Sequence, residues 1–318
     1  YQAAQAVFAK IGKLEPDYKD AHSLEETAYL EPLYLSGKAS FSAGLYRRAY
    51  GTLDSVVAKS ATYKDAAALR QQCVDKGRYA IAVLPFSMAN GRSLGRSTQL
   101  AALEAYVTSA LIGVNDPFLS VVDRDNIQRI LDEQRLGMSG VVDESTAVSA
   151  GKLLGAQAVV MGTLISYSEV PGSLRQSTKE GYESYQEKQL DQTTNQFVNV
   201  VRYKPVNYTE YYQENTAAIS FSYKLVSLET GQVLLSNVVD KQVGDHAWYA
   251  SYDGNASLLY PKSNGAVNTA AAGRRDLTSL LNGSRALKSV GTLGNDVLHT
   301  ISFDMATSIE QELAAKLP

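Results

Sequence analysis

The chain has 318 residues, of which 45% are apolar and 20% are charged, so it is long enough for two domains with ordinary hydrophobic cores. The formal net charge is −3 and there is no run of Lys or Arg, which argues against nucleic acid or an anionic membrane surface as a partner. Cys73 is the only cysteine, so an intrachain disulfide and a multi-cysteine metal site are both excluded. No apolar stretch approaches the ~20 residues that a membrane-spanning helix needs.

Residues 1–77 contain an internal repeat in which Tyr1 corresponds to Tyr46. The copies align Tyr1, Ala4, Phe8, Ile11, Tyr18-Lys19-Asp20-Ala21 and Leu24 with Tyr46, Ala49, Leu53, Val56, Tyr63-Lys64-Asp65-Ala66 and Leu69. Apolar residues three and four positions apart predict a helix in each copy, and the Lys-Asp-Ala turn opens a second helix. Because such a hairpin covers its apolar face only by stacking on a neighbour, we predict a tetratricopeptide-like solenoid. It is either a protein-docking surface or a spacer for the next domain.

Tyr1 is itself part of the helical pattern, and the sequence has no starting Met and no signal peptide. We expect the mature protein to extend upstream, with further repeats, or to have been processed. A secretion signal or a lipid anchor would then lie outside this sequence.

After Gly77 the pattern changes to short strands that alternate with helices. Apolar runs rich in β-branched and aromatic residues predict strands over residues 79–86, 118–122 and 156–166. Helical spacing predicts helices over residues 100–111, 126–134 and 145–154, the last ended by Gly155. After a long polar stretch, a hairpin is predicted over residues 217–228 and 232–243, and a final helix from about Leu293. These elements predict an α/β sandwich with a mixed sheet.

The densest polar cluster, Asp123-Arg124-Asp125-Asn126, follows a predicted strand, where ligands often bind in α/β sheets. Asp125 or Asn126 can instead cap the next helix, on which Arg129 and Glu133 form a surface pair. We keep both interpretations, and the candidate subunit or partner contacts in this cluster are Asp123, Arg124, Asn126, Arg129 and Glu133.

Tyrosine is concentrated in one region, with 11 of the 20 tyrosines between Tyr167 and Tyr260. Tyrosine suits wet protein interfaces and membrane headgroup belts alike, because it has a broad ring and a polar tip. These tyrosines belong to ordinary long loops, to a subunit contact or to a membrane-inserted segment. The candidate contact residues are Tyr203, Tyr208, Tyr211, Tyr212, Trp248, Tyr249 and Tyr252.

No pattern in the sequence indicates catalysis. The three histidines, His22, His246 and His299, have no metal-ligand spacing, and no phosphate loop, Gly-x-Gly-x-x-Gly or Gly-x-Ser-x-Gly pattern occurs. We therefore predict no catalytic residue, no cofactor and no metal site, and we expect the protein not to be an enzyme.

Four segments in order resemble the CsgG family of curli-assembly lipoproteins. They lie at residues 81–86 (Ile-Ala-Val-Leu-Pro-Phe), 121–136, 154–164 and 225–234. The resemblance implies a CsgG-like α/β domain over residues 78–318, with a fold like that of the amino-terminal domain of TolB. It also implies two long insertions, at about 167–215 and 237–290, after the helical repeats of residues 1–77.

The resemblance implies that the protein is a component of the cell envelope. We expect a non-enzymatic assembly or secretion-associated lipoprotein that self-associates into a ring or polymer, with a protein partner recruited by the repeats. It would lie on the periplasmic side of the outer membrane or at the cell surface, held by an anchor outside this sequence. The alternatives are an outer-membrane secretion pore built from the two insertions and a monomeric periplasmic regulator of a cell-wall synthase.

Overall fold

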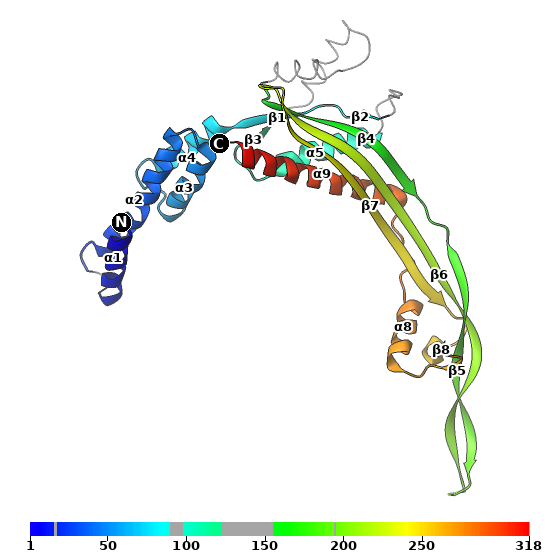
Figure 1. Ribbon diagram of the computed structural model, residues 1–318. Coiled ribbons are helices and arrows are strands. Elements are labelled where there is room, and N and C mark those ends of the chain that lie inside the picture. The colour runs from blue at the N-terminus through cyan, green and yellow to red at the C-terminus, as the bar shows by residue number, and fades with distance from the viewer. Residues whose placement is uncertain (16–17, 90–97, 123–154, 194, 318) are drawn as a thin grey trace, which may run out of the picture. The chain divides into compact units, whose positions relative to one another are not determined.

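The computed structural model describes residues 1–15, 18–89, 98–122, 155–193 and 195–317. The chain divides into two compact units. The first comprises Tyr1–Thr163, Ser222–Val238 and Ser302–Pro318, and the second comprises Leu164–Phe221 and Val239–Ile301. Helices at the N-terminus are followed by a mixed sheet with helices, as Figure 1 shows. The expected α/β architecture is therefore present.

Four helices open the first unit: α1 (Gln2–Leu14), α2 (Ala21–Ser42), α3 (Tyr46–Lys59) and α4 (Ala66–Gly77). The two turns that join α1 to α2 and α3 to α4 match at two described positions. Lys19 and Lys64 both have positive φ, at 45° and 49°, and the preceding helices both end on an extended residue, Glu15 or Ser60. The sequence repeat is thus also a repeat of local geometry, whereas its tetratricopeptide-like class stays a prediction.

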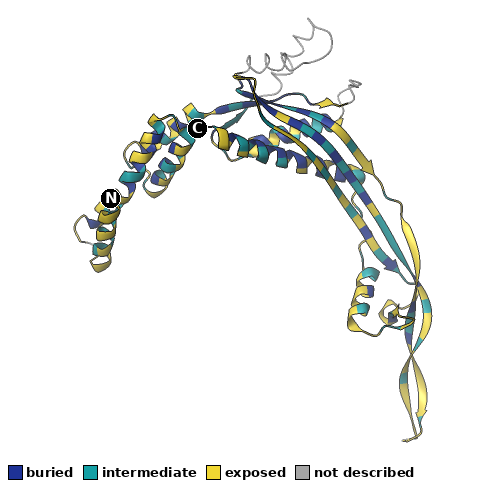
Figure 2. Cartoon of the chain, viewed as in Figure 1, coloured by how far each residue is buried: buried dark blue, intermediate teal, exposed yellow. Residues whose placement is uncertain are grey.

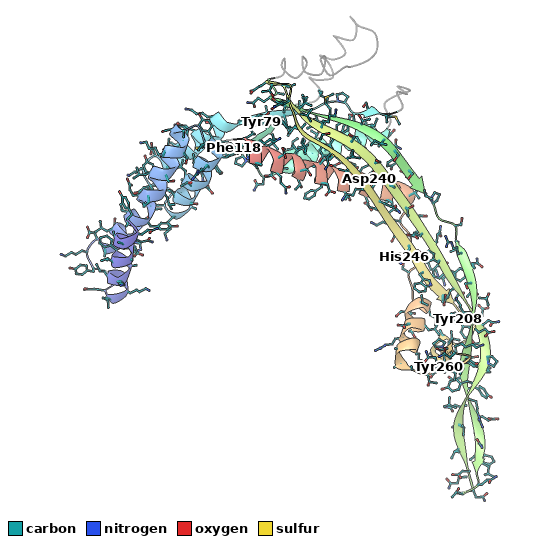
Figure 3. The ribbon with its side chains drawn as sticks, in the orientation of Figure 1. Tyr79, Phe118, Tyr208, Asp240, His246 and Tyr260 are labelled. Carbon is teal, nitrogen blue, oxygen red and sulfur yellow. The ribbon has the colours of Figure 1, made fainter. Side chains whose placement is uncertain are left out.

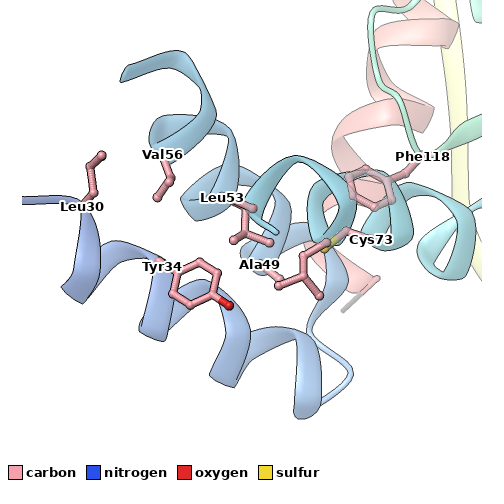
Figure 4. Packing of buried hydrophobic residues seen from close by; sticks show 9 residues of the cluster. Leu30, Tyr34, Ala49, Leu53, Val56, Cys73 and Phe118 are labelled. Atoms are coloured by element: carbon pink, nitrogen blue, oxygen red, sulfur yellow. The ribbon is translucent and has the colours of Figure 1, made fainter. Parts of the chain in front are cut away.

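The helices enclose their own hydrophobic cluster. Figure 4 shows Leu30 and Tyr34 of α2 facing Leu53 and Val56 of α3. Phe118 belongs to the same cluster although it lies forty residues beyond α4 along the chain. Its ring makes an edge contact with Tyr50, at 5.4 Å between centroids. Phe118 therefore packs the helices against the start of a sheet strand within the first unit.

The parallel part of the sheet consists of β1 (Tyr79–Val83), β3 (Leu119–Val121) and β4 (Ala158–Val170). β1 lies between the other two, with Ile81 paired to Val121 on one side and to Ala158 on the other. A short strand, β2 (Ser87–Met88), pairs with β4. The helix α5 (Thr98–Gly113) has the predicted buried stripe: Leu100, Leu103, Val107 and Leu111. The sequence pattern located β1, β3, β4 and α5, whereas β2 was not predicted.

Long antiparallel strands extend the sheet: β5 (Arg175–Asp191), β6 (Gln196–Ser227) and β7 (Val233–Ser251). The main strand order is β3-β1-β4-β6-β5-β8-β9, and β7 pairs with β6. Figure 2 shows buried and less buried positions alternating along β6 near its C-terminal end, where every second residue from Ala217 to Leu225 is buried. The predicted hairpin turn is present, with φ of +71° at Gly231. Its strands are longer than predicted, because they continue through the polar stretch.

The remaining elements are a short 3-10 turn η1 (Ala256–Leu258), β8 (Leu259–Ser263), β9 (Ala266–Val267), α8 (Ala271–Leu281) and α9 (Val290–Lys316). The predicted stripe of α9 is buried: Leu293, Val297, Ile301, Met305, Ile309 and Leu313. Across the described residues, no helix is both long enough and apolar enough to cross a membrane. The helices predicted over 126–134 and 145–154 lie outside the described residues.

Candidate assembly surface

Aromatic rings from β6 and β7 stack on each other in the second unit. Tyr211 and Tyr249 are parallel, with 4.9 Å between ring centroids and 11° between planes. The guanidinium of Arg285 lies 5.1 Å from the Tyr249 ring, a distance at which a cation is attracted to an aromatic face. Tyr212 stacks on His246 at 5.9 Å. Three of the predicted contact residues thus hold neighbouring segments of one chain together.

A second aromatic group lies where the β5–β6 hairpin meets β8 and α8. The Tyr203 and Tyr260 rings meet edge to face at 5.2 Å, and Arg274 donates to the Tyr260 hydroxyl at 3.0 Å. An open pocket of about 660 Å³ adjoins these side chains and also borders Arg275 and Ser279. The pocket is polar and basic on its α8 side. The tyrosine, arginine and hydroxyl side chains of its lining are suited to a hydrated contact surface.

Tyr208 and Tyr252 belong to the interior of this unit. Tyr208 is buried with Ala250, Leu259 and Leu277, and Tyr252 packs against the same cluster. Figure 3 shows Tyr208 and Tyr260 in this part of the chain. Tyr208 is 8% exposed, so it stabilises the unit and does not offer a free surface. Trp248 is 52% exposed, which makes it the most accessible of the candidates that the structure describes.

The pKa of Tyr208 leads to a test of this burial. Burial and then the nearby charge of Glu210 raise the pKa of Tyr208 from 10.0 to about 12. Because the unfolded chain loses this proton first, the stabilisation by neutral Tyr208 is complete below pH 10 and is lost as the pH rises toward 12. Urea denaturation across this range should show a steeper loss of stability in the parent chain than in Tyr208→Phe. Equal slopes would contradict the burial.

The distal half of the β5–β6 hairpin lies within the expected insertion at about 167–215, but the sequence analysis did not predict its strands. The two strands pair continuously from Arg175–Tyr212 to Asp191–Gln196, whereas β8 pairs with β5 only at residues 181–183. We call residues 183–191 of β5 and 196–204 of β6 the ribbon. Figure 1 shows it extending beyond the end of β7, and Figure 2 shows it largely exposed. It is a two-stranded extension without its own core.

The ribbon carries both exposed apolar side chains and cross-strand ion pairs. Phe197 is 72% exposed and Val201 52%, and Leu190 lies directly opposite Phe197. These three residues share one face because side chains on a strand alternate between faces. Two ion pairs join the strands, Lys204–Glu183 at 2.7 Å and Arg202–Glu187 at 3.1 Å. Lys204 holds the pKa of Glu183 below its usual value through this contact.

The five candidates at residues 123–133 (Asp123, Arg124, Asn126, Arg129 and Glu133) lie outside the described residues. Among the residues that are described, no three His, Cys, Asp or Glu side chains come close enough to hold a metal ion. Cys73 is buried in the helical cluster, and burial raises the pKa of its thiol. A protonated, inaccessible thiol is a poor nucleophile.

Comparison with known proteins relates the chain to an envelope family. A family model described as "Curli production assembly/transport component CsgG" matches residues 59–257. The lipoprotein GNA1162 from Neisseria meningitidis is 15% identical, with 52% of this chain and 83% of that chain covered and a TM-score of 0.28. The PelC dodecamer from Paraburkholderia phytofirmans is 10% identical, with 72% and 89% covered and a TM-score of 0.26. No curated protein matches the sequence.

Proposed function

The chain belongs to the CsgG family, whose model spans more than half of it, and we propose that it is a non-enzymatic assembly component of a bacterial cell envelope. In this proposal, copies of the chain associate through the CsgG-like domain into a ring or polymer on the periplasmic side of the outer membrane or at the cell surface. A membrane anchor would be supplied by a segment outside this sequence. The observation that carries the proposal is the ribbon.

An isolated two-stranded ribbon is only marginally stable in water, and a free strand edge pairs readily with another strand. In the part of the chain that the structure describes, β5 beyond Glu183 is paired with β6 alone. A second copy paired at this edge would extend the ladder and place its own apolar face beside the face that carries Phe197 and Val201. Self-association therefore removes the free edge of the ribbon and joins the apolar faces of neighbouring copies.

The charges of the ribbon favour an identical neighbour. Its β5 strand contains Glu183, Glu187, Lys188 and Asp191, with a net charge of −2, and its β6 strand contains Arg202 and Lys204, with a net charge of +2. These charges pair across the two strands of one ribbon as Lys204–Glu183 and Arg202–Glu187, and the same pairs can form between the β5 edge of one copy and the β6 edge of the next. Such a contact joins two different surfaces, and its repetition generates a ring if the rotation closes or a filament if it does not.

The test removes the ribbon and leaves its base intact. Deleting residues 185–202 and joining Ser184 to Tyr203 through Asn-Gly retains a paired end and a turn that favours hairpins. We expect the parent chain to form discrete rings or polymers in sedimentation velocity and electron microscopy, and the shortened chain to sediment as a monomer. A parent chain that stays monomeric at high concentration, or a shortened chain that still assembles, would overturn the proposal.

A charge variant tests whether assembly depends on pairing between ribbon edges, because it changes the charges of the ribbon and keeps its length. Arg202→Glu with Lys204→Glu should abolish assembly, because two acidic edges then meet. Arg48→Glu with Lys59→Glu makes the same change in net charge on exposed positions of α3 and should assemble like the parent. Equal behaviour of the two variants would show that net charge, and not the ribbon, controls assembly.

The exposed apolar end of the ribbon favours one alternative, a secretion pore whose wall includes the ribbon. A lipid-facing strand needs an apolar residue at every second position, and the ribbon alternates only in part. Ion conductance of the assembled chain in planar bilayers would favour the pore. An intact assembly without conductance favours a scaffold, and a monomer would favour the alternative of a periplasmic regulator.

The organisation of the chain is part of the same proposal. Residues 1–77 form a tetratricopeptide-like module that recruits a protein partner, and residues 78–318 form the assembling domain, with insertions at about 167–215 and 237–290. The matching turns at Lys19 and Lys64 support the first assignment. The second compact unit, Leu164–Phe221 with Val239–Ile301, overlaps both expected insertions and supports the second.

A further inference from the structure

One face of α8 forms most of the pocket in the second unit. The α8 residues that line it are Ala271, Arg274, Arg275, Thr278 and Ser279. They follow the three- and four-residue spacing of a single helix face, whereas Leu277 is buried in the cluster on another face. Figure 1 shows α8 beside β8, which pairs with β5 where the ribbon begins. The helix thus turns its apolar side to the core and a polar, basic side to the pocket.

The lining of the pocket can donate many hydrogen bonds but contains no carboxylate. Besides two arginines, its described side chains are two tyrosines, two threonines, one serine and one alanine. The acidic residues of the adjoining β5 strand are paired elsewhere, Glu180 with Lys262 and Glu183 with Lys204. Asp276, the acidic residue of α8, is not part of the lining. The pocket is therefore electropositive.

The two arginines of the pocket have different surroundings. The guanidinium of Arg274 lies 4.6 Å from the Tyr260 ring centroid and donates to the Tyr260 hydroxyl and to the Ser257 carbonyl. Because that hydroxyl accepts from Arg274, it still has its own proton to donate. Arg275 is exposed and makes no hydrogen bond, ion pair or ring contact with any residue that the structure describes. One arginine therefore fixes the aromatic wall, and the other is available to a ligand.

The surroundings of the pocket argue against a peptide ligand. β8 lies between β5 and β9 in the sheet, so it offers no free edge that an extended peptide could join. No Leu, Ile, Val, Met or Phe lines the described pocket, so an amphipathic helix would find no apolar anchor there. The volume of about 660 Å³ is that of a small-molecule pocket and far exceeds what one inorganic anion fills.

We propose that this pocket binds an acidic saccharide, meaning a sugar ring that carries a carboxylate or a phosphate group. Arg275 pairs with the anionic group through charge-assisted hydrogen bonds. The C–H face of the sugar ring packs on the rings of Tyr203 and Tyr260, which combine apolar area with a polar tip. The sugar hydroxyls exchange hydrogen bonds with Thr269, Ser279 and the Tyr260 hydroxyl. Because the pocket is open, a longer saccharide can extend from it into solvent.

Titration calorimetry of the full chain with defined ligands tests the proposal. The acidic sugars are trigalacturonate and glucose-6-phosphate, which carry a carboxylate and a phosphate. The methyl ester of trigalacturonate keeps the rings without the charge, whereas hexaglutamate and inorganic phosphate keep the charge without the rings. We expect at least one acidic sugar to bind at least tenfold more tightly than all three controls. The chain with the shortened ribbon retains every lining residue and should bind equally well, so the result is independent of assembly.

Three variants locate the binding in the pocket. Arg275→Gln removes the available cation without breaking a described contact, so the chain should fold and its affinity for the acidic sugar should fall at least tenfold. Tyr203→Leu keeps an apolar side chain but removes the ring, and should weaken binding at least fivefold. Arg48→Gln makes the same charge change on an exposed position of α3 and should bind like the parent.

Three results would overturn the proposal. The first is that neither acidic sugar binds. The second is that the methyl ester, hexaglutamate or inorganic phosphate binds as tightly as the acidic sugar, because the site would then not recognise a charged sugar ring. The third is that Arg275→Gln binds as tightly as Arg48→Gln, because the sugar would then bind elsewhere on the chain.

Discussion

Replacing Phe118 by alanine is expected to lower the free energy of unfolding by about 3–5 kcal/mol, the usual cost of truncating a buried phenylalanine. The side chain is 3% exposed and belongs to the cluster of α2, α3 and α4. It also contacts the cation of Arg47, at 4.9 Å from the ring centroid, and approaches Gly77 so closely that a Cβ there would lie 2.8 Å from the ring. The substitution would remove all of these contacts and leave a cavity between the helices and the sheet.

Phe303 provides a matched control for this substitution. Its side chain lies on α9 and is 69% exposed, so Phe303→Ala should change stability by less than about 0.5 kcal/mol. Urea denaturation followed by circular dichroism measures both variants, and hydrogen exchange of Phe118→Ala should show the largest loss of protection in α3 and α4. Similar effects of the two substitutions would mean that the helices do not depend on Phe118.

Buried elements were predictable because burial leaves a pattern in the sequence. The stripe of α5, the apolar run of β1 and the stripe of α9 are each covered on the side that the pattern indicated. The family resemblance rested on these same core segments, and the family match confirms it. The role of Phe118 was not predictable, because a strand residue and a helical cluster member have the same apolar character.

The ribbon was missed for the opposite reason. Most residues of β5 beyond Ser184 are exposed on both faces, so they show no alternation of apolar and polar residues. Their strand conformation is maintained by pairing with β6, a long-range contact that a local pattern does not contain.

The candidate contact residues were predicted by composition, which locates tyrosines but not their burial. Tyr208 and Trp248 looked equivalent in the sequence, yet one is buried in a cluster and the other is half exposed. The Tyr-Lys-Asp turn was recognised as part of a repeat. The contacts of its second copy with Glu31 and Tyr34 became clear only from the structure, because they join positions about thirty residues apart.

Replacing Gly172 by alanine should be as damaging to the second unit as Phe118→Ala is to the first. A Cβ at this position would lie 1.9 Å from the backbone oxygen of Glu214, which cannot rotate away as a side chain would. Gly172 is also fixed at both ends, because its N–H donates to Asn215 and its carbonyl accepts from Gln213, each at 2.9 Å. We expect a loss of about 3 kcal/mol or more, at the upper end of the cost of overpacking.

Gly291 is the control, since a Cβ there would meet open space. Gly291→Ala in α9 should leave stability unchanged or raise it by up to about 1 kcal/mol, because alanine is the better helix former. Both variants are measured by urea denaturation and by hydrogen exchange across β5 and β6. Gly172 lies in the connection between β4 and β5, so the disorder caused by Gly172→Ala should extend to the base of the ribbon and reduce assembly. The Gly291→Ala chain should assemble like the parent. A Gly172→Ala chain with normal exchange in β5 and normal assembly would show that the backbone at this joint can shift without cost.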